Sequence, residues 1–439
     1  MVRLSDSSIM NFNEVIRNKL FFFMDRVLKK GIYDQITSVE EDVRNPRFEY
    51  KLNEIISHAG RTVPYYHTYK DVADISQMPV VNKSIIRKES QSFLSTSYAK
   101  NELIKVTTSG SSGTPMEFYR EHNKRIRQIA EVIFLGIPIK YYFGMKHGFI
   151  RATHPKSRLN LLLQNEIHID PTKMSADALE KIRTDIKEMK CIIGFPSTLY
   201  EIALYCEKKG DTPKHFNLVG LICTAEPLLE KQKTVIQRVF GCPIQVRYAA
   251  EELGLIAVQN PGSPFYRVNQ ASFYVEILKL DSDSPCEEGE EGRIVITDLE
   301  AKAMPLIRYD TGDLGVMKIE EIRGERIVTL SSISGRKIEM LFSPTGEKIS
   351  PFSINVKMKD VKGVIKFQFI QQDKNNYTMK VVTDEAYYDE TKLLRILHGI
   401  LGENAMISIE KVNEIKPLAS GKTAYIVNEY IQKDEARTS

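Results

Sequence analysis

The sequence predicts an α/β protein with a large N-terminal domain of mainly parallel sheets, helices and a small β-subdomain, followed by a small mobile α+β domain. Three observations predict it. Strand-like and helix-like segments alternate from about residue 100 to 250, strand-like segments alone fill about 270–332, and a last unit of about 100 residues follows. Because single cores stop growing near ~250–300 residues, a chain of 439 residues is expected to hold more than one. We place the domains at 1–335 and 336–439, with the β-rich subdomain at about 270–332.

Residues 1 to about 90 are expected to form helices with short connections. The apolar residues Phe21 to Met24 are followed by Arg26, Lys29 and Lys30, a pattern typical of an amphipathic helix. We expect this apolar stripe to pack inward on a larger body. A membrane-surface role is the alternative.

The central region predicts an α/β core. Ser175 can cap a helix whose apolar residues Leu179, Ile182 and Ile186 lie on one face. The connections are short enough for a parallel sheet. The expected elements after Ser175 are a strand over 191–195, a helix from Ser197 to Gly210, a strand over 218–223, a helix from Pro227 to Gly241 and a strand over 244–248.

The remaining segments predict a β-rich region and then a mixed unit. Strands are expected over 273–280, 292–299 and 325–331, with six acids between Asp281 and Glu291 in a solvated hairpin loop. In the last unit, strands are expected near 364–370 and 377–382 and a helix near 389–401.

Composition excludes several classes of protein. Lys plus Arg number 61 against 57 Asp plus Glu, and the charges are spread along the chain, so nucleic acid is not an expected partner. No apolar run approaches the ~18 residues of a membrane span, and the expected location is the cytoplasm. The five cysteines show no Cys-x-x-Cys spacing and the eight histidines no His-Glu-x-x-His, so we expect reduced thiols and no structural metal.

The first candidate motif is the small-residue run from Thr107 to Pro115, directly after the strand-like residues 103–106. Small residues allow several backbone N–H groups to face one anion, and the hydroxyl groups add donors, so the run suits a polyphosphate. It lacks the lysine of the Gly-x-x-x-x-Gly-Lys loop, and a flexible surface loop is the alternative.

Two further motifs carry charge. Residues 305–313 end in Thr311-Gly312-Asp313, and a carboxylate held by such a turn can accept two hydrogen bonds from vicinal hydroxyls, as in a ribose. The alternative is an ordinary glycine turn with a capping Asp. Residues 415–423 hold Lys422 after a Ser-Gly turn, where a mobile terminal unit could deliver its charge to a site in the large domain, or where it is simply solvated.

Together and in this order, these motifs resemble the adenylate-forming superfamily of acyl-CoA synthetases, nonribosomal adenylation domains and luciferases. The chain looks most like the phenylacetate–CoA ligase group, especially its branch in capsular and exopolysaccharide biosynthesis. The resemblance runs from about Lys105 to Val427. It includes Ala225-Glu226-Pro227-Leu228, residues 240–243, and residues 248–252, where Ala249 replaces the usual glycine and Glu251 the usual Thr or Ser.

The resemblance implies ATP, Mg²⁺ and a nucleotide site. Tyr248 would stack near adenine, Asp313 would hold the ribose, Glu252 would bind Mg²⁺, and Lys422 would be the lysine of adenylation. Arg336, in a hinge, would reach the nucleotide. The other nucleotide-binding residues implied are Thr108, Ser109, Gly110, Ser111, Ser112, Gly113, Thr114, Ala225, Glu226, Pro227, Ala249, Ala250 and Glu251.

Glu251 brings an extra negative charge beside phosphate. Either its side chain turns away, which we favour, or it binds a second cation or a cationic substrate, or activity is impaired. Residues 343–351 look like the polysaccharide branch rather than the glycine loop of true CoA ligases, which weakens the case for CoA.

The reaction implied is attack of a carboxylate on the α-phosphorus of ATP, which releases pyrophosphate and leaves an acyl-adenylate. The acceptor that follows is CoA, a carrier-protein thiol, or an amine on a sugar or amino acid. The acid pocket is expected to involve residues 195–200 and Ala225 with Tyr141 or Phe143, although core packing is the preferred interpretation for the last two. The basic residues Arg151, Lys156 and Arg158 around His154 are expected in a solvated loop, with an anion site as the alternative.

Two other classes of function stay open. The departures Ala249 and Glu251 would suit a nucleotide-binding relative without turnover. An unrelated kinase or ATPase is the other class, but the chain lacks a phosphate-loop lysine and a second magnesium acid. The identity of the acid and the oligomeric state, including a homodimer, are not determined by the sequence.

Overall fold

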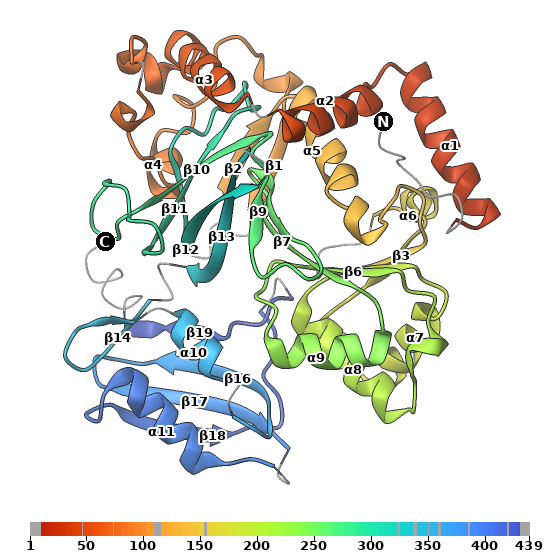
Figure 1. The fold of residues 1–439 in the computed structure, drawn as a ribbon, viewed down its shortest axis with the longest axis vertical. Helices are drawn as coiled ribbons and strands as arrows, with labels where there is room; N and C mark the ends of the chain where they lie inside the picture. Colours follow the sequence, from red (N-terminus) through yellow and green to blue (C-terminus); the bar gives the residue numbers. More distant parts are fainter. Residues whose placement is uncertain are drawn as a thin grey trace.

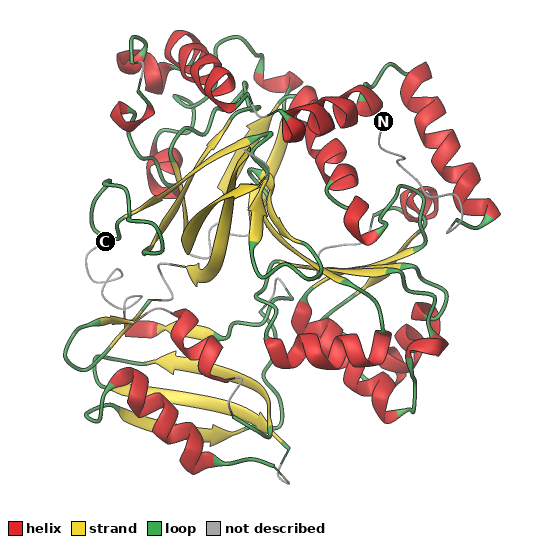
Figure 2. Ribbon diagram, viewed as in Figure 1, coloured by secondary structure: helices red, strands yellow, loops and turns green. Residues whose placement is uncertain are grey.

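In this computed structural model, the described residues are 10–45, 47–72, 74–108, 116–152, 156–322, 325–336, 340–349, 351–358, 361–384, 387–418 and 421–430. Within them, eleven strands form one sheet in the order β10-β11-β12-β13-β9-β8-β7-β6-β5-β3-β4. A separate four-stranded sheet near the C-terminus lies below the large body (Figures 1 and 2). The α/β class predicted from the sequence is confirmed.

The N-terminal region is helical, as predicted. It contains α1 (Phe12–Val27), α2 (Ile32–Arg44), α3 (Phe48–Thr62) and α4 (Lys83–Lys88). The start of α1 is fixed by a reciprocal cap, in which the Asn11 side chain accepts from the Glu14 N–H and the Glu14 carboxylate accepts from the Asn11 N–H. Both oxygens of Asp25 accept N–H groups from the first turn of α2.

The expectation that the Phe21–Met24 stripe packs inward is only half right. Phe21 stacks on Phe143, with ring centroids 3.6 Å apart. Phe23 and Met24, however, are 64% and 47% exposed. The cause is that the inward face of α1 is occupied largely by polar groups that are satisfied there by hydrogen bonds.

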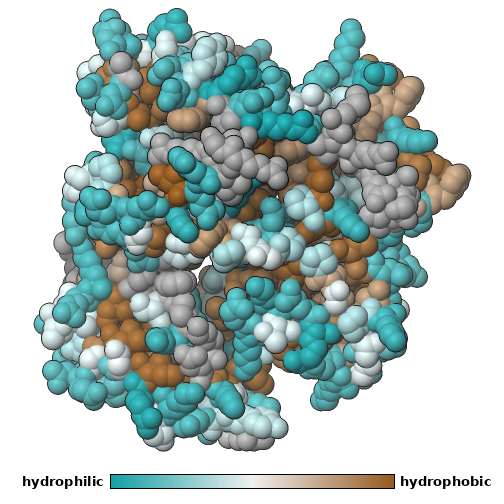
Figure 3. Space-filling view, viewed as in Figure 1, coloured by the Kyte–Doolittle hydropathy of each residue, from teal (hydrophilic) through white to brown (hydrophobic). Residues whose placement is uncertain are grey.

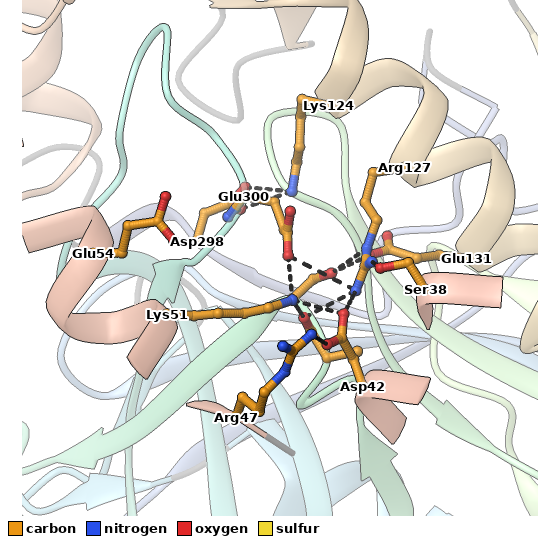
Figure 4. A network of polar contacts seen from close by, with 12 residues as sticks. Ser38, Asp42, Arg47, Lys51, Glu54, Lys124, Arg127, Glu131, Asp298 and Glu300 are labelled. Atoms are coloured by element: carbon orange, nitrogen blue, oxygen red, sulfur yellow. Dashed lines mark hydrogen bonds and ion pairs between the residues drawn. The ribbon is translucent and has the colours of Figure 1, made fainter. Parts of the chain in front are cut away.

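A buried network of charges attaches the N-terminal helices to the sheet (Figure 4). Asp42 of α2 accepts from Lys51 of α3 at 2.7 Å and from Arg127 of α5 (His122–Phe134) at 2.9 Å. Burial would raise the pKa of Asp42, but these two cations hold it below its usual value. Nearby, Lys124 lies 2.7 Å from Asp298, whose pKa is raised by burial to about 6 although the lysine opposes the rise.

The α/β core follows the predicted succession. The parallel strands are β3 (His147–Ile150), β4 (Glu166–Ile169), β5 (Cys191–Gly194), β6 (Gly220–Thr224) and β7 (Ile244–Ala250). One face is covered by α7 (Ala176–Ile186), α8 (Pro196–Lys208) and α9 (Glu230–Phe240). Ser175 caps α7 as predicted, with its hydroxyl accepting from the Ala178 N–H. Helix α9 begins at Glu230 rather than at Pro227, and Gly241 ends it in the left-handed conformation.

The β-rich region continues the same sheet in antiparallel fashion. Its strands are β8 (Gly254–Gln259), β9 (Tyr266–Val268), β10 (Phe273–Leu278), β11 (Glu291–Asp298), β12 (Tyr309–Ile322) and β13 (Glu325–Arg336). The acid-rich segment joins β10 to β11 as a loop, as expected. Strand β12 was not anticipated at this length, because its first residues read as a turn motif.

A hairpin brackets the predicted phosphate loop. It consists of β1 (Ile104–Thr108) and β2 (Met116–Arg120), and Thr108 pairs with Met116. The loop residues Ser109 to Pro115 themselves lie outside the described residues.

The C-terminal part has its own core. It contains β14 (Leu341–Phe342), β15 (Lys348–Ile349), α10 (Pro351–Lys357), β16 (Val364–Gln371), β17 (Asn376–Thr383), α11 (Glu390–Leu401), β18 (Met406–Lys411) and β19 (Ile426–Asn428). Phe369, Tyr377 and Leu393 are among its fully buried residues. The two strands and the helix predicted here are present. The domain boundary that we place after residue 335 stays a prediction.

The remaining expectations concern cysteines and membranes. All five cysteines are free thiols, four of them buried. None of the described helices has the length and apolarity that crossing a membrane requires.

Candidate active site

The pairing of Tyr248 with Asp313 joins two of the predicted motifs. The Tyr248 hydroxyl, at the end of β7, donates to Asp313 Oδ2 at 2.7 Å. Asp313 is held in turn by its own N–H, which donates to Thr311 Oγ1 at 3.1 Å. Gly312 has φ +82°, which few other residues adopt. The predicted Thr-Gly turn is therefore a kink inside β12 rather than a connection between strands, and it presents the carboxylate rigidly.

Glu252 lies beside a tyrosine and a lysine. Its Oε1 accepts from the Tyr309 hydroxyl at 2.8 Å and lies 3.1 Å from Lys83 Nζ. Burial first, and then the charge of Glu252, raises the pKa of Tyr309 far above its usual value. Lys83 comes from α4, which the pairing of Val81 with Tyr309 draws to the site. No sequence motif pointed to Lys83, whereas Tyr309 lies inside the quoted 305–313 segment.

The donor set at Glu252 fits a magnesium ion that also holds phosphate. Both of these contacts of the carboxylate are made by Oε1, and Glu252 is the residue that would hold the ion. No cluster of three or more His, Cys, Asp or Glu side chains able to hold a metal occurs in the described part of the chain. A metal site built from protein ligands alone is therefore not found among the described residues. A single carboxylate together with water and ATP phosphates suits Mg²⁺.

Glu226 connects the end of β6 to the loop that carries Lys422. Its Oε2 accepts from the Ser197 N–H at 3.2 Å, and its Oε1 accepts from the Thr423 N–H. Burial raises the pKa of Glu226, while the N–H groups of Thr423 and Ser197 and the charge of Lys422 oppose that rise. The preceding residue, Ala225, adopts φ +68°, a conformation that costs a non-glycine residue energy.

Gly421 packs the lysine loop against the large body. A Cβ atom there would lie 2.6 Å from Pro171 Cγ and 3.0 Å from Ala152 Cβ, and the residue has φ +80°. Only glycine fits both conditions. Residues from 171, 226 and 421–423, far apart in the sequence, therefore meet at the carboxyl ends of the parallel strands, where ligands of open α/β sheets bind.

The other predicted nucleotide residues fall into three groups. Ala249 and Ala250 end β7 after an irregularity in the ladder at Tyr248, and Pro227 follows Glu226. The backbone of Arg336, at the end of β13, pairs with Asp313, although the side chain lies outside what the structure describes. Thr108 ends β1, and Ser109, Gly110, Ser111, Ser112, Gly113 and Thr114 lie outside the described residues.

Glu251 is exposed and directly follows β7. Burial and then the charge of Arg125 lower the pKa of Arg120, a residue of the hairpin strand β2, and the charge of Glu251 opposes this lowering. Whether Glu251 turns away from bound phosphate stays a prediction.

The basic segment after β3 is only in part the solvated segment that we expected: Arg158 is exposed, but the other two cations are not free in solvent. Arg151 and Lys156 both bind the buried Glu166, the latter at 2.9 Å, and His147 lies 3.7 Å from the same carboxylate. Burial alone would raise the pKa of Glu166, but these groups together lower it to about 2. His154 lies outside the described residues.

The residues expected around the acid are largely packed in the cores of the large body. Residues 196–200, the first residues of α8, are buried, and Leu199 and Tyr200 belong to the core between α8 and the sheet. Tyr141 packs against a small core cluster that includes Tyr142 and Cys191, which confirms core packing for it, and its ring centroid also lies 5.8 Å from the guanidinium carbon of Arg247. Phe143 is half-buried and stacks on Phe21 of α1.

Comparison with known proteins gives consistent matches. The family model for the CapK C-terminal domain matches residues 341–429. Protein CapK of Staphylococcus aureus is 25% identical over 96% of this chain and 98% of its own length. A phenylacetate-coenzyme A ligase of Thermus thermophilus is 22% identical over 72% of this chain and 75% of its own. A crystal structure of 2-hydroxyisobutyryl-CoA ligase in the postadenylation state superposes with a TM-score of 0.70 at 16% identity, covering 89% of this chain and 90% of that one.

Proposed function

Because this chain is homologous to Protein CapK and to the phenylacetate–CoA ligases and has the fold of adenylate-forming ligases, we propose that it activates a carboxylic acid with ATP. The product is an acyl-adenylate, and the acyl group then passes to a thiol or an amine. One observation carries the proposal. The Lys422 loop is seated on Glu226 at the end of β6, and on the neighbouring strand β7 Tyr248 binds Asp313.

In the adenylation step, a carboxylate oxygen of the acid forms a bond to the α-phosphorus of ATP as the bond to pyrophosphate breaks. Two anions must approach each other, so the barrier is largely electrostatic and positional. The charge of Lys422 would stabilise the pentacoordinate transition state at the α-phosphorus, and Glu252 would hold a magnesium ion that supplies positive charge against the phosphates. No general base is needed, because a carboxylic acid is already ionised near pH 7.

Asp313 and Tyr248 are proposed to position the nucleotide. The Asp313 carboxylate would accept hydrogen bonds from the ribose hydroxyls, and the Tyr248 hydroxyl fixes its orientation. The Tyr248 ring would lie against the adenine, and Arg336 would reach the nucleotide from the end of β13. The phosphate loop at 108–114 would supply N–H donors to the phosphates.

Transfer of the acyl group requires Lys422 to leave. The contacts that hold the C-terminal part to the large body include polar side-chain pairs, one of them buried and one half-buried. Gln232 Nε2 donates to the Tyr425 hydroxyl at 2.8 Å, and Lys366 Nζ donates to Glu201 at 2.8 Å. Such contacts can break and re-form, so we propose that the C-terminal part rotates about residues near Arg336 to admit the acceptor.

The proposed acyl acceptor is CoA, a carrier-protein thiol or an amine. All three attack the same acyl-adenylate carbonyl and displace AMP, so the first step does not distinguish them. Cofactor requirements follow from this choice: ATP and Mg²⁺ in every case, and CoA only in the first.

The test is ATP–pyrophosphate exchange with Mg²⁺ over a panel of aryl, fatty, hydroxy and amino acids, since exchange reports adenylation without the acceptor. Lys422→Ala is expected to abolish exchange while ATP still binds. Lys416→Ala, an exposed lysine of the same segment, is the matched control and should retain exchange. Full exchange in the Lys422 variant would remove this lysine from the chemistry.

A nucleotide-binding relative without turnover is the second candidate. Ala249 and Glu251 favour it, because they replace the usual glycine and Thr or Ser and Glu251 puts an extra negative charge beside the phosphates. This candidate expects ATP binding, no exchange with any acid, and the appearance of exchange when Ala249→Gly and Glu251→Thr are combined. Formation of ADP rather than AMP would instead support a kinase or ATPase.

A further inference from the structure

Four arginines are buried in the described part of the chain, and three of them are paired with carboxylates. Arg127 binds Asp42 at 2.9 Å, Arg293 binds Asp310 at 2.8 Å and Arg308 binds Glu276 at 3.1 Å. The fourth, Arg247, is 8% exposed and forms no ion pair with any described acid. A guanidinium cannot lose its charge by deprotonation, so burial without a counter-charge is costly.

The side chain of Arg247 is nevertheless held firmly. Its Nε donates to Gln245 Oε1 at 2.8 Å, and its Nη2 donates to the Val132 carbonyl at 3.4 Å. Gln245 is itself fixed by the Leu135 carbonyl at 2.7 Å and by Asn260 Oδ1 at 2.9 Å. Neutral partners fix the position of the guanidinium without compensating its charge. This arrangement is expected of a residue that binds an anion.

Arg247 directly precedes Tyr248 in β7, but its side chain lies on the opposite sheet face, which carries Gln245, and beside Tyr141. Ala250, which ends the strand, is three residues further, roughly 10 Å at ~3.3 Å per residue. Adenylation takes place beyond that end, near Glu252. Arg247 is therefore placed for the far end of a bound acid rather than for its reacting carboxylate.

The surrounding charges do not compensate Arg247. The pKa of the neighbouring Tyr141 is raised by burial and also by the charge of Glu166, but Glu166 already binds Arg151 and Lys156. We infer that Arg247 binds a second anionic group of the substrate, which is thus a carboxylic acid with another carboxylate or a phosphonate-like group at its far end. This inference rests on the proposed function.

The test compares acids of matched length: pentanoate, glutarate and 4-phosphonobutanoate. We expect kcat/KM for exchange to be about 10- to 100-fold higher with the dianionic acids, the range of a hydrogen bond to a charged group. Comparing glutarate with the phosphonate tells which second anion is preferred. Arg247→Met should abolish the preference, and Arg247→Lys should restore part of it because the charge returns without the planar fork.

Thermal stability distinguishes a binding role of Arg247 from a structural role. Arg247→Met should leave the thermal midpoint unchanged or higher, whereas the matched control Arg308→Met should lower it, because Glu276 loses its partner. Equal exchange with mono- and dianionic acids, a panel without any preference, or a fall in midpoint equal to that of Arg308→Met would each overturn the inference. Calorimetric binding of glutarate without exchange would support Arg247 and contradict the proposed function.

A different observation concerns α1. Phe12, Ile16, Leu20, Phe23 and Val27 are between 47% and 82% exposed. At ~100° per residue they fall within an arc of about 80° on the helix. Figure 3 shows hydrophobic side chains gathered over this helix at the right edge. Three exposed leucines of α6 (Arg158–Gln164) adjoin it, since Arg17 donates to the Leu162 carbonyl.

The charged side chains of α1 indicate which kind of surface covers this apolar stripe. Its two acids are buried and engaged, Glu14 with Lys190 at 2.9 Å and Asp25 with the N–H groups of α2. The exposed charged residues between 12 and 31 are all basic: Lys19, Arg26, Lys29 and Lys30. A second copy docked face to face would bring these cations against one another. We propose that α1 lies on an anionic membrane surface, with the apolar stripe in the headgroup region and the cations at lipid phosphates.

Vesicle sedimentation tests this surface. The full chain should bind vesicles of phosphatidylcholine with 30% phosphatidylglycerol, and binding should weaken with salt and be lost in pure phosphatidylcholine. Phe23→Gln with Val27→Gln should reduce binding at least tenfold, and Lys19→Gln with Arg26→Gln should remove the dependence on phosphatidylglycerol. Met406→Gln, an equally exposed apolar residue far along the chain, is the control and should bind normally. No binding to anionic vesicles, or a dimer in light scattering that the Phe23 and Val27 changes dissociate, would overturn the proposal.

Discussion

At the scale of single residues, the site depends on partners that the sequence could not pair. Tyr248 and Asp313 belong to separate motifs, and their 2.7 Å hydrogen bond is made only when β7 and β12 lie in one sheet. Glu252 is likewise fixed by Tyr309 and Lys83. The roles proposed for these residues can be separated by substitution.

Asp313→Ala is expected to weaken ATP binding about 10- to 100-fold, which corresponds to ~1.5–3 kcal/mol for hydrogen bonds to a charged group. Tyr248→Phe, which keeps the ring and removes only the hydroxyl, should weaken it less. Isothermal calorimetry with ATP measures both. Unchanged affinity in Asp313→Ala would contradict the ribose role.

The lysine loop can be displaced by a single methyl group. Gly421→Ala combines a left-handed φ with a clash against Pro171, so it should lower exchange nearly as far as Lys422→Ala does. Gly210→Ala is the matched control: its φ is +76°, but no atom lies within 4 Å of the added Cβ, so it should lose some stability and keep exchange. If both variants exchange equally well, seating of the loop is not required.

At the scale of elements, the sequence predicted structure well where a segment itself contains the residues that start, end or bury it. Ser175 caps α7, Gly241 ends α9, and buried apolar runs form β5 and β6, all as expected from local sequence. Helix α1 is a helix as predicted, yet its exposed face is the apolar one. Apolar periodicity predicts that the segment is helical. It does not predict which face of the helix meets the core, because that face depends on the elements that pack against the helix.

The pair β3–β4 carries a pH-dependent contribution to stability. The pKa of Glu166 is lowered to about 2, so its stabilising effect is complete above its ordinary value near 4.5 and is lost as the pH falls from there towards 2. At pH 7 the contribution is on the order of 3 kcal/mol. Urea unfolding of Glu166→Gln should show this loss at pH 7 and a smaller difference from the unsubstituted protein at pH 3.

The control for this effect is Glu188→Gln. Glu188 pairs with Lys146 on the surface and is 73% exposed, so its removal should leave stability nearly unchanged at either pH. Equal pH profiles for the two variants would show that the cluster around Glu166 does not stabilise the fold.

At the scale of the whole molecule, the arrangement of the C-terminal part on the large body is proposed to be the one that adenylates. Lys366 and Glu201 mark this contact at 2.8 Å. In a Cys286→Ser background, cysteines at both positions joined by a short cleavable bismaleimide should leave exchange intact. The singly substituted Lys366→Cys protein treated with the same reagent is the control. Loss of exchange on cross-linking, restored by cleavage, would contradict an adenylation-competent arrangement.

The sequence by itself determined the α/β class, the resemblance to adenylate-forming ligases and the order of the motifs. These are properties of contiguous residues, where spacing and side-chain size act locally. The family model for the CapK C-terminal domain and the homologues agree with that prediction.

Only the tertiary structure decided which of those residues meet. It placed Glu226 beneath Thr423 of the lysine loop, Lys83 beside Glu252, Arg247 without a counter-charge, and the apolar face of α1 outward. The physical reason is that the effect of a charge depends on the groups that desolvate it, and the effect of an apolar surface depends on the groups that cover it. That depends on the burial of distant segments against each other, which spacing along one segment does not encode.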